Sequence, residues 1–163
     1  MKSLLHPISL DQVHELATMA KEIWYEYYLS IITQEQIDYM LDQFYHREKL
    51  ENEWKIGNHF FYIGESEDPI GYLSISGNEE GQFFIHKFYL KKENRGGGIG
   101  SRVFSEILKK HPNTKEIRLQ VNRMNVASIN FYFKNGFKIE KWADFEIGNG
   151  YEMNDYIMLW KQP

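Results

Sequence analysis

The chain has 163 residues, 42% of them hydrophobic and 26% charged, so it is long enough for one domain with a sizeable buried core. Because it has no cysteine, disulfides, thiolate metal sites and a cysteine nucleophile are excluded. A formal net charge of −4, the lack of a membrane-spanning apolar run and an N-terminus unlike a signal peptide predict a cytoplasmic protein with neither nucleic acid nor membrane as partner.

The N-terminal segment predicts a short edge strand followed by a helix. The strand covers residues 4–8, where Pro7 is tolerated because an edge amide needs no partner. Ser9 or Asp11 is expected to cap the helix, whose apolar stripe runs from Val13 to Trp24.

The end of this first helix is unusually aromatic and acidic. One interpretation is core packing by Trp24, with tyrosine hydroxyls at the rim. The other is a substrate wall, in which aromatic faces and carboxylates attract an ammonium group. On the second interpretation the substrate residues are Trp24, Tyr25, Glu26 and Tyr28.

A second helix is predicted where the segment Thr33-Gln34-Glu35-Gln36 has the pattern of a capping box. The apolar residues that follow at helical spacing, and that we expect to point inward, are Ile37, Met40, Leu41 and Phe44. A third helical stretch, from about residue 47 to 56, is so charged that we expect mainly a solvated face.

The remaining sequence predicts an α/β fold with a mixed sheet. Three strands joined by tight turns form an antiparallel meander over residues 59–65, 70–76 and 83–90. A glycine turn, a helix to about His111, a strand over residues 116–121 and a helix over residues 126–135 then form a βαβα unit. Two strands over residues 137–142 and 153–160 complete the sheet, and we find no domain boundary.

The glycine turn, Asn94 to Ser101, lies between a strand and a helix start. Glycines permit positive φ and leave no Cβ in the way, while the first amides of a helix lack internal acceptors, so such a turn can cradle phosphate. No Lys-Ser/Thr pair follows the glycines, which excludes a Walker loop, and the spacing fits a dinucleotide fingerprint poorly. A mobile turn without a ligand is the alternative.

Two motifs favour a specific ligand. Arg95, Gly98 and Gly100 form the pattern Arg-x-x-Gly-x-Gly, which resembles the acyl-CoA pyrophosphate loop of the GNAT (GCN5-related N-acetyltransferase) superfamily. The segment from Asn125 to Phe137 is similar to the second motif of that superfamily, with Ser128 where alanine is more usual. The resemblance covers the chain from about Phe60 onward and implies one N-acetyltransferase domain, residues 1–163, with the GNAT fold and acetyl-CoA as cofactor.

The resemblance also assigns the coenzyme site. It implies that backbone amides of the turn bind the pyrophosphate, that an amide near Leu90 meets the oxyanion, and that Asn125 caps a helix and reaches the cofactor. Lys134 is either an adenosine-phosphate contact or an ordinary surface lysine. The predicted cofactor residues are Phe88, Tyr89, Leu90, Arg95, Gly96, Gly97, Gly98, Ile99, Gly100, Ser101, Asn125 and Lys134.

Two side chains are predicted to move protons. Tyr132 occupies the position of the family's general acid, and a phenol with a pKa near ~10 stays protonated at neutral pH and can protonate a thiolate. His86 lies where related enzymes often carry a glutamate base, and its ordinary pKa near ~6.5 suits that role. A lone strand histidine is also commonly structural. The histidines show no metal-ligand spacing, so no metal is expected.

The resemblance leaves the acceptor open. The C-terminal segment of the chain, residues 150–158, is similar to that of a bacterial subgroup of spermidine/spermine acetyltransferases. Four carboxylates could pair with a polyamine: Glu22, Glu26, Glu152 and Asp155. Direct acetyl transfer to a primary amine of a small molecule is therefore expected. A protein or peptide N-acetyltransferase and a non-catalytic acyl-CoA-binding module are the alternatives. A homodimer is compatible with the resemblance.

Overall fold

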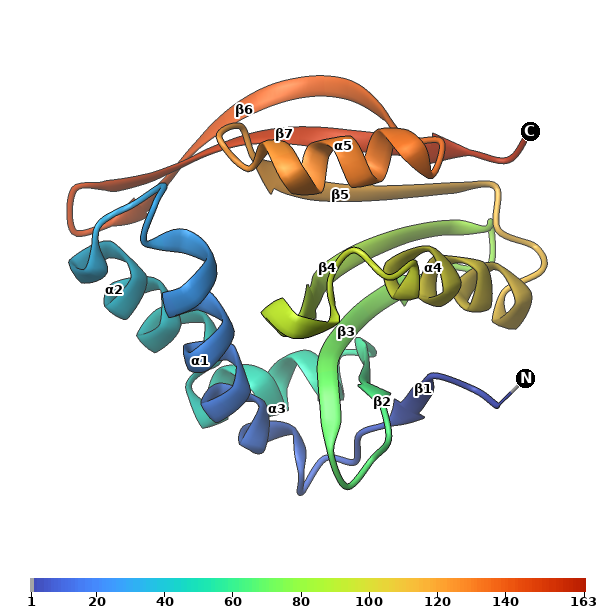
Figure 1. Ribbon diagram of the computed structural model, residues 1–163, viewed down its shortest axis with the longest axis horizontal. Coiled ribbons are helices and arrows are strands. Elements are labelled where there is room, and N and C mark those ends of the chain that lie inside the picture. Colours follow the sequence, from blue (N-terminus) through green and yellow to red (C-terminus); the bar gives the residue numbers. More distant parts are fainter. Residues whose placement is uncertain (1) are drawn as a thin grey trace.

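The computed structural model describes residues 2–163 and contains a seven-stranded mixed sheet, which confirms the predicted α/β architecture (Figure 1). The strand order is β1-β2-β3-β4-β5-β7-β6, with β4 and β5 parallel and the other neighbours antiparallel. The strands are β1 Leu5–Pro7, β2 His59–Gly64, β3 Pro69–Gly77, β4 Gln82–Leu90, β5 Glu116–Asn122, β6 Lys138–Gly148 and β7 Tyr151–Lys161.

Helices cover both faces of this sheet. On one face they build a core around Tyr72 and on the other around Leu73, because successive strand residues point to opposite sides. The first face carries η1 Val13–Glu15, α1 Leu16–Tyr28, α2 Gln34–Tyr45 and α3 Arg47–Lys55. The second carries α4 Ile99–Lys110, preceded by η2 Lys92–Asn94, and α5 Val126–Lys134.

The N-termini of α1 and α2 differ in how they are capped. The Thr33 hydroxyl accepts the Gln36 amide at 3.2 Å, which confirms the predicted cap of α2. The predicted cap of α1 by Ser9 or Asp11 is wrong. No side chain caps that helix, because the chain enters it through the short turn η1 and the Ser9 carbonyl, not its hydroxyl, accepts the amides that open this turn.

The last two strands are longer than the apolar pattern indicated. They form a hairpin that continues along β6 to Gly148 and resumes at Tyr151 in β7. The turn contains Asn149 with a φ of 54° and Gly150 with a φ of 78°, the left-handed backbone that a tight hairpin requires. Most of the β6 side chains are exposed, so their sequence lacks the apolar alternation of a buried strand.

The central strands separate halfway along their length. Pairing of β4 with β5 begins at Gln82 opposite Glu116 and ends at Ile85 opposite Leu119. The next residue of β4, His86, is an extra residue in the register against β3, which is a β-bulge that bends the strand. Beyond it the facing edges of the two strands are unpaired with each other, and this gap joins the two faces of the sheet.

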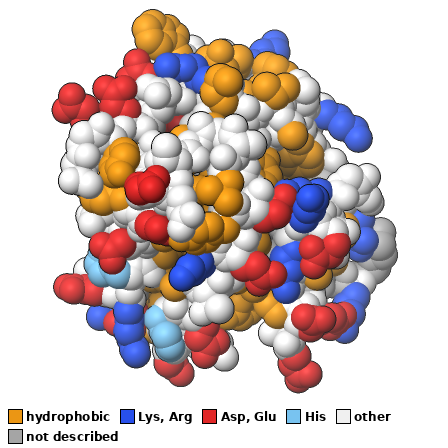
Figure 2. Space-filling view, turned by 60° about the vertical axis from the view of Figure 1, so that its left-hand side comes forward, with side chains coloured by type: hydrophobic (Ala, Val, Ile, Leu, Met, Phe, Trp, Pro, Cys, Tyr) orange, Lys and Arg blue, Asp and Glu red, His pale blue; other side chains and the backbone are white. Residues whose placement is uncertain are grey.

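Within residues 2–163, no helix is both long and apolar enough to cross a membrane. On the face shown in Figure 2, acidic and basic side chains are interspersed around apolar ones. The third helix is mainly solvated, as its charge predicts, although Leu50 is fully buried and Glu53 pairs with a lysine of β4.

Candidate active site

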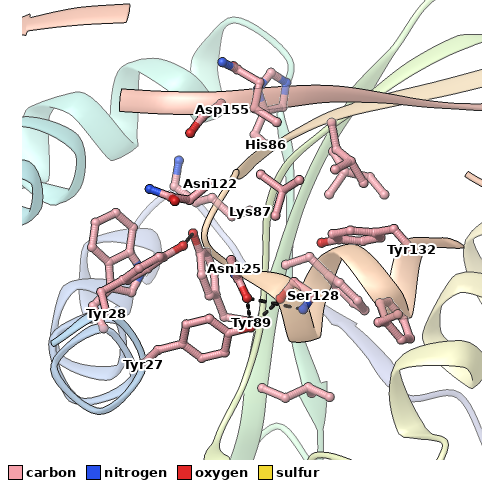
Figure 3. A pocket seen from close by; sticks show the side chains of 18 of the residues that line it. Tyr27, Tyr28, His86, Lys87, Tyr89, Asn122, Asn125, Ser128, Tyr132 and Asp155 are labelled. Atoms are coloured by element: carbon pink, nitrogen blue, oxygen red, sulfur yellow. Dashed lines mark hydrogen bonds between the residues drawn. The ribbon is translucent and has the colours of Figure 1, made fainter. Parts of the chain in front are cut away.

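A cavity of about 720 Å³ occupies the gap between β4 and β5. It is lined by the glycine turn and α5 on one face of the sheet, and by α1, α2 and α3 on the other (Figure 3). Two molecules can therefore enter from opposite faces and meet between the strands.

The glycine turn offers an unobstructed row of amides. Gly96 and Gly98 have φ values of 83° and 80°, and a Cβ at Gly96, Gly97 or Gly98 would meet no atom within 4 Å. The first helical bond of α4 runs from the Arg102 amide to the Gly98 carbonyl at 3.1 Å, so the three amides between them have no acceptor within the helix. This open, positively polarised turn fits a diphosphate such as that of coenzyme A.

Gly100 is required for a different reason. A Cβ there would lie 2.8 Å from the ring of Phe131, so only glycine lets the first turn of α4 pack this closely on α5. The Phe131 ring in turn stacks on Phe88 of β4, with 6.0 Å between centroids. This contact holds the turn beside the exposed edge of the strand.

The edge of β4 directs backbone donors into the gap. The Lys91 amide donates to the Ile70 carbonyl of β3 at 2.8 Å. Because backbone groups alternate along a strand, the amides of Phe88 and Leu90 point the other way, toward the cavity. They are suitably placed to stabilise an oxyanion. The Leu90 carbonyl, on the same side, accepts a hydrogen bond from the Nε of Arg95 at 3.0 Å.

Asn125 caps α5 and is already hydrogen-bonded. Its Oδ1 accepts the Ser128 amide at 3.2 Å and the Tyr27 hydroxyl at 2.8 Å. The Tyr27 hydroxyl also contacts the hydroxyl of Ser128. These bonds tie α1 to α5 across the cavity, and Lys134 at the end of α5 also lines it.

Tyr132 projects from α5 into the cavity and is 8% exposed (Figure 3). Within the described part of the chain, its hydroxyl has no hydrogen-bond partner. Burial, reinforced by the nearby phenols of Tyr27 and Tyr28, raises the pKa of Tyr132 well above its ordinary value. The phenol is therefore protonated throughout the physiological pH range and free to donate.

His86 lines the cavity from the bulge of β4, where its Nε2 lies 2.7 Å from the Ser76 hydroxyl of β3. Burial and then the adjacent Lys87 ammonium lower the pKa of His86, so its imidazole is neutral at pH 7. The bulge also turns Lys87 inward, where it forms a buried ion pair with Glu53 at 2.9 Å. Burial lowers the pKa of Lys87, and the carboxylate of Glu53 opposes that change.

Some aromatic residues at the end of α1 face the cavity, as a substrate wall requires, and others do not. Trp24 and Tyr28 line the cavity, and the Tyr28 hydroxyl lies 3.1 Å from that of Tyr89. Tyr25 turns away and donates to Asp38 of α2. Glu26 lies outside the cavity lining and pairs with Arg95 at 2.7 Å.

Among the predicted cofactor residues, Gly97 and Ile99 belong to the turn but do not line the cavity. All the other predicted cofactor residues line the cavity: Phe88, Tyr89, Leu90, Arg95, Gly96, Gly98, Gly100, Ser101, Asn125 and Lys134.

Asp155 of β7 is a buried carboxylate that faces the cavity with 3% exposure. It lies opposite Asn122 of β5. The neighbouring cation, Arg123, pairs instead with Asp144 at 2.8 Å and reaches only the backbone carbonyl of Asp155. Burial raises the pKa of Asp155 to about 6, with Arg123 opposing the change and Asp144 adding to it.

Several cavity residues were not predicted from the sequence. Tyr27 could have been predicted, because it lies at the same end of α1 as the predicted substrate residues and directly precedes Tyr28. Lys87 and Asn122 carried no signal, because the bulge that turns Lys87 inward and the separation of the strands are tertiary features. No group of three or more histidine, aspartate or glutamate side chains within residues 2–163 could hold a metal ion.

Comparison with known proteins agrees with this geometry. Residues 17–137 match the model of the acetyltransferase (GNAT) family. The spermidine N(1)-acetyltransferase of Thermoplasma acidophilum is 31% identical over 159 residues, which cover 91% of this chain and 97% of that protein. The peptidyl-lysine N-acetyltransferase YjaB of Escherichia coli is 30% identical over 77 residues, 47% of each chain. The crystal structure of the T. acidophilum PaiA N-acetyltransferase in complex with coenzyme A is 28% identical, with a TM-score of 0.79 and coverage of 99% of this chain and 100% of that one.

Proposed function

The chain belongs to the GNAT acetyltransferase family, and we propose that it transfers the acetyl group of acetyl-CoA directly to a primary amine of a small, polyamine-like molecule. The observation that carries this proposal is the single cavity in which the glycine turn, the Tyr132 hydroxyl and an aromatic, carboxylate-bearing wall meet. The similarity to a spermidine acetyltransferase over nearly the whole chain supports the choice of acceptor.

The donor side holds and activates the thioester. When bound, acetyl-CoA supplies an acyl carbon that an amine can attack. The amides of the glycine turn bind the diphosphate, and the amides of Phe88 and Leu90 hydrogen-bond the carbonyl oxygen as negative charge develops on it. Tyr132 donates its proton to the departing sulfur, which neutralises the negative charge that develops on sulfur as the carbon–sulfur bond breaks.

The acceptor side positions the amine. Trp24 and Tyr28 present aromatic faces that attract an ammonium group, and Asp155 supplies a negative charge on the same side of the sheet. Because the two substrates enter from opposite faces, the reacting atoms can approach within the gap without either substrate blocking the other.

A peptide acceptor is the alternative function. The relative that acts on peptidyl-lysine matches only 77 residues, 47% of this chain, so it gives less support for the choice of acceptor. A non-catalytic coenzyme-binding role is disfavoured by the unpaired Tyr132 hydroxyl in the cavity.

The test is to incubate the protein with acetyl-CoA and a panel of amines and to measure free thiol release. The panel contains spermidine, spermine, monoamines and peptides with free N-termini or lysines. We expect turnover with spermidine or spermine above that with peptides. Turnover with a peptide and none with polyamines would overturn the small-amine proposal, and no turnover with any amine would favour the non-catalytic role.

A further inference from the structure

Building on the proposed function, we propose that Asp155 is the residue that binds the acceptor ammonium group and removes its proton. His86, the base predicted from the sequence, then has a different role.

Asp155 is on the acceptor side of the gap. Along β7, Met158 and Trp160 pack in the core beneath α4 and α5, so the residues of opposite parity face α1 and α2. Met153, which packs with α1 and α2, and Asp155 have that parity. Figure 3 shows the Asp155 and Tyr132 side chains projecting into the same cavity from different elements. An amine held at Asp155 therefore approaches the acyl group from the side opposite to Tyr132.

The Asp155 carboxylate is buried without a partner. It is 3% exposed, and within residues 2–163 it takes part in no side-chain hydrogen bond or ion pair. A buried ionised carboxylate is unstable unless a cation or hydrogen-bond donors compensate it. Since the carboxylate opens onto the cavity, the ammonium group of a bound amine can supply the compensating positive charge.

The charged surroundings keep Asp155 both available and basic. Arg123 is neutralised by Asp144 at 2.8 Å, so it does not close off the Asp155 carboxylate. Arg123 and Asp144 act on the Asp155 pKa in opposite directions, and the buried Tyr28 phenol on α1 also faces this carboxylate. With a pKa raised to about 6, Asp155 is ionised at pH 7 yet a stronger base than an ordinary aspartate.

His86 is less well placed for this step. Its Nε2 is 2.7 Å from the Ser76 hydroxyl. His86 is also an exposed residue, whereas Asp155 is buried. The same bulge sets Lys87, a cation, directly beside it. A neutral imidazole has no negative charge with which to bind an ammonium group, whereas the Asp155 carboxylate has one.

The proton balance of the reaction is complete with these groups. Asp155 takes one proton from the ammonium group, and the free amine attacks the acyl carbon. The carbon–nitrogen bond forms and the carbon–sulfur bond breaks. The thiolate receives the Tyr132 proton, and the second proton lost by the nitrogen restores the Tyr132 phenol. Asp155 releases its proton to solvent, so each turnover liberates one proton.

The first experiment measures the pH dependence of kcat/KM with spermidine and acetyl-CoA for the wild type, Asp155→Asn and His86→Asn. We expect the wild type to lose activity below a pKa near 6. The kcat/KM of Asp155→Asn at pH 7 should be lower by about 100-fold or more, and this variant should no longer show the acidic decline in kcat/KM, which is the acidic limb of the pH profile. His86→Asn should retain that limb. A limb that persists in Asp155→Asn but vanishes in His86→Asn would overturn the assignment.

The second experiment does not depend on turnover. Spermidine should raise the melting temperature of the wild type but not that of Asp155→Asn, with Glu146→Gln as the charge-matched control that still responds. Equal shifts in wild type and Asp155→Asn would show that the ammonium group binds elsewhere and would overturn the inference. Failure of the proposed function looks different, since it would leave the amine panel without polyamine turnover.

Discussion

The two sides of the cavity are built in different ways. On the donor side, the glycine turn, the Asn125 cap and Tyr132 lie within two continuous stretches of sequence, and each stretch forms one turn and one helix. On the acceptor side, the lining residues come from four elements that are far apart in the sequence, α1, α2, α3 and β7. Local backbone chemistry thus sets the proposed coenzyme site, whereas packing of distant elements sets the proposed amine site. Substitutions on the two sides should therefore have different signatures.

The largest effect is expected on the donor side for Tyr132→Phe. Loss of the phenolic proton should lower kcat by about 100-fold or more, with little change in the KM for acetyl-CoA, because the hydroxyl acts on the leaving sulfur. Steady-state kinetics of thiol release measure this effect. Stability should be unchanged, since no described hydrogen bond is lost.

Tyr62→Phe is the matched control for Tyr132→Phe. Tyr62 lies outside the cavity, and its hydroxyl makes one long contact with Glu15 at 3.5 Å. Its turnover should equal that of the wild type. Undiminished turnover in Tyr132→Phe would contradict the role of this residue and would require another acid.

On the acceptor side, Asp155→Asn should stabilise the protein while it lowers activity. The folded pKa of about 6 exceeds the unfolded value near ~4, so the folded state binds more protons between these values and stability falls as pH rises through that window. Removing the carboxylate should add about 2 kcal/mol to the free energy of unfolding at pH 7.5, after a discount for water in the cavity, and almost nothing at pH 4.

Chemical denaturation at both pH values measures this difference. Glu146→Gln, an exposed carboxylate on β6, should change the free energy of unfolding by less than about 0.5 kcal/mol. A loss of stability in Asp155→Asn at pH 7.5 would mean that the carboxylate has a protein partner.

A smaller effect is expected for Gly98→Ala in the donor turn. Alanine is strained at a φ of 80°, and relaxation of the turn should misdirect the amides and raise the Kd for coenzyme A about tenfold. Isothermal titration calorimetry measures it. Gly57→Ala has comparable strain, with a φ of 106° and open space around the Cβ, but lies outside the cavity, so it should bind coenzyme A normally. Equal weakening in both variants would point to a global effect.

The smallest effect joins the two sides. Glu26 of α1 holds Arg95 at 2.7 Å, and this partly exposed pair competes with any phosphate that approaches the guanidinium group. Glu26→Gln should therefore tighten coenzyme A binding by about twofold to fivefold at low salt. Glu22→Gln, one turn earlier and exposed, should leave the Kd unchanged. Weaker binding in Glu26→Gln would show that the pair positions Arg95 instead of restraining it.

The sequence predicted the local structure of the donor side well, because the signals for a turn and a helix cap are local. A glycine at positive φ, a helix cap and an apolar period each act within a few residues, so Gly98 and Asn125 were found by pattern. The mixed sheet followed from the same signals. The homodimer remains a prediction.

The acceptor side could not be predicted to the same depth. The bulge at His86 breaks the alternation of β4 and turns Lys87 inward, which no pattern indicated. Asp155 was recognised as an acidic residue, but its isolation depends on the pairing of Arg123 with Asp144 across two strands. Tyr25 shows the converse, since it shares the aromatic cluster of α1 but contacts Asp38 and does not line the cavity.

The most direct measurement is a crystal structure of the protein with coenzyme A and spermidine. We expect the diphosphate on the amides of the glycine turn, the sulfur beside the Tyr132 hydroxyl, and a terminal ammonium group on the Asp155 carboxylate from the opposite face of the sheet. Coenzyme bound outside the gap between β4 and β5, or both ligands entering from one face, would contradict this arrangement.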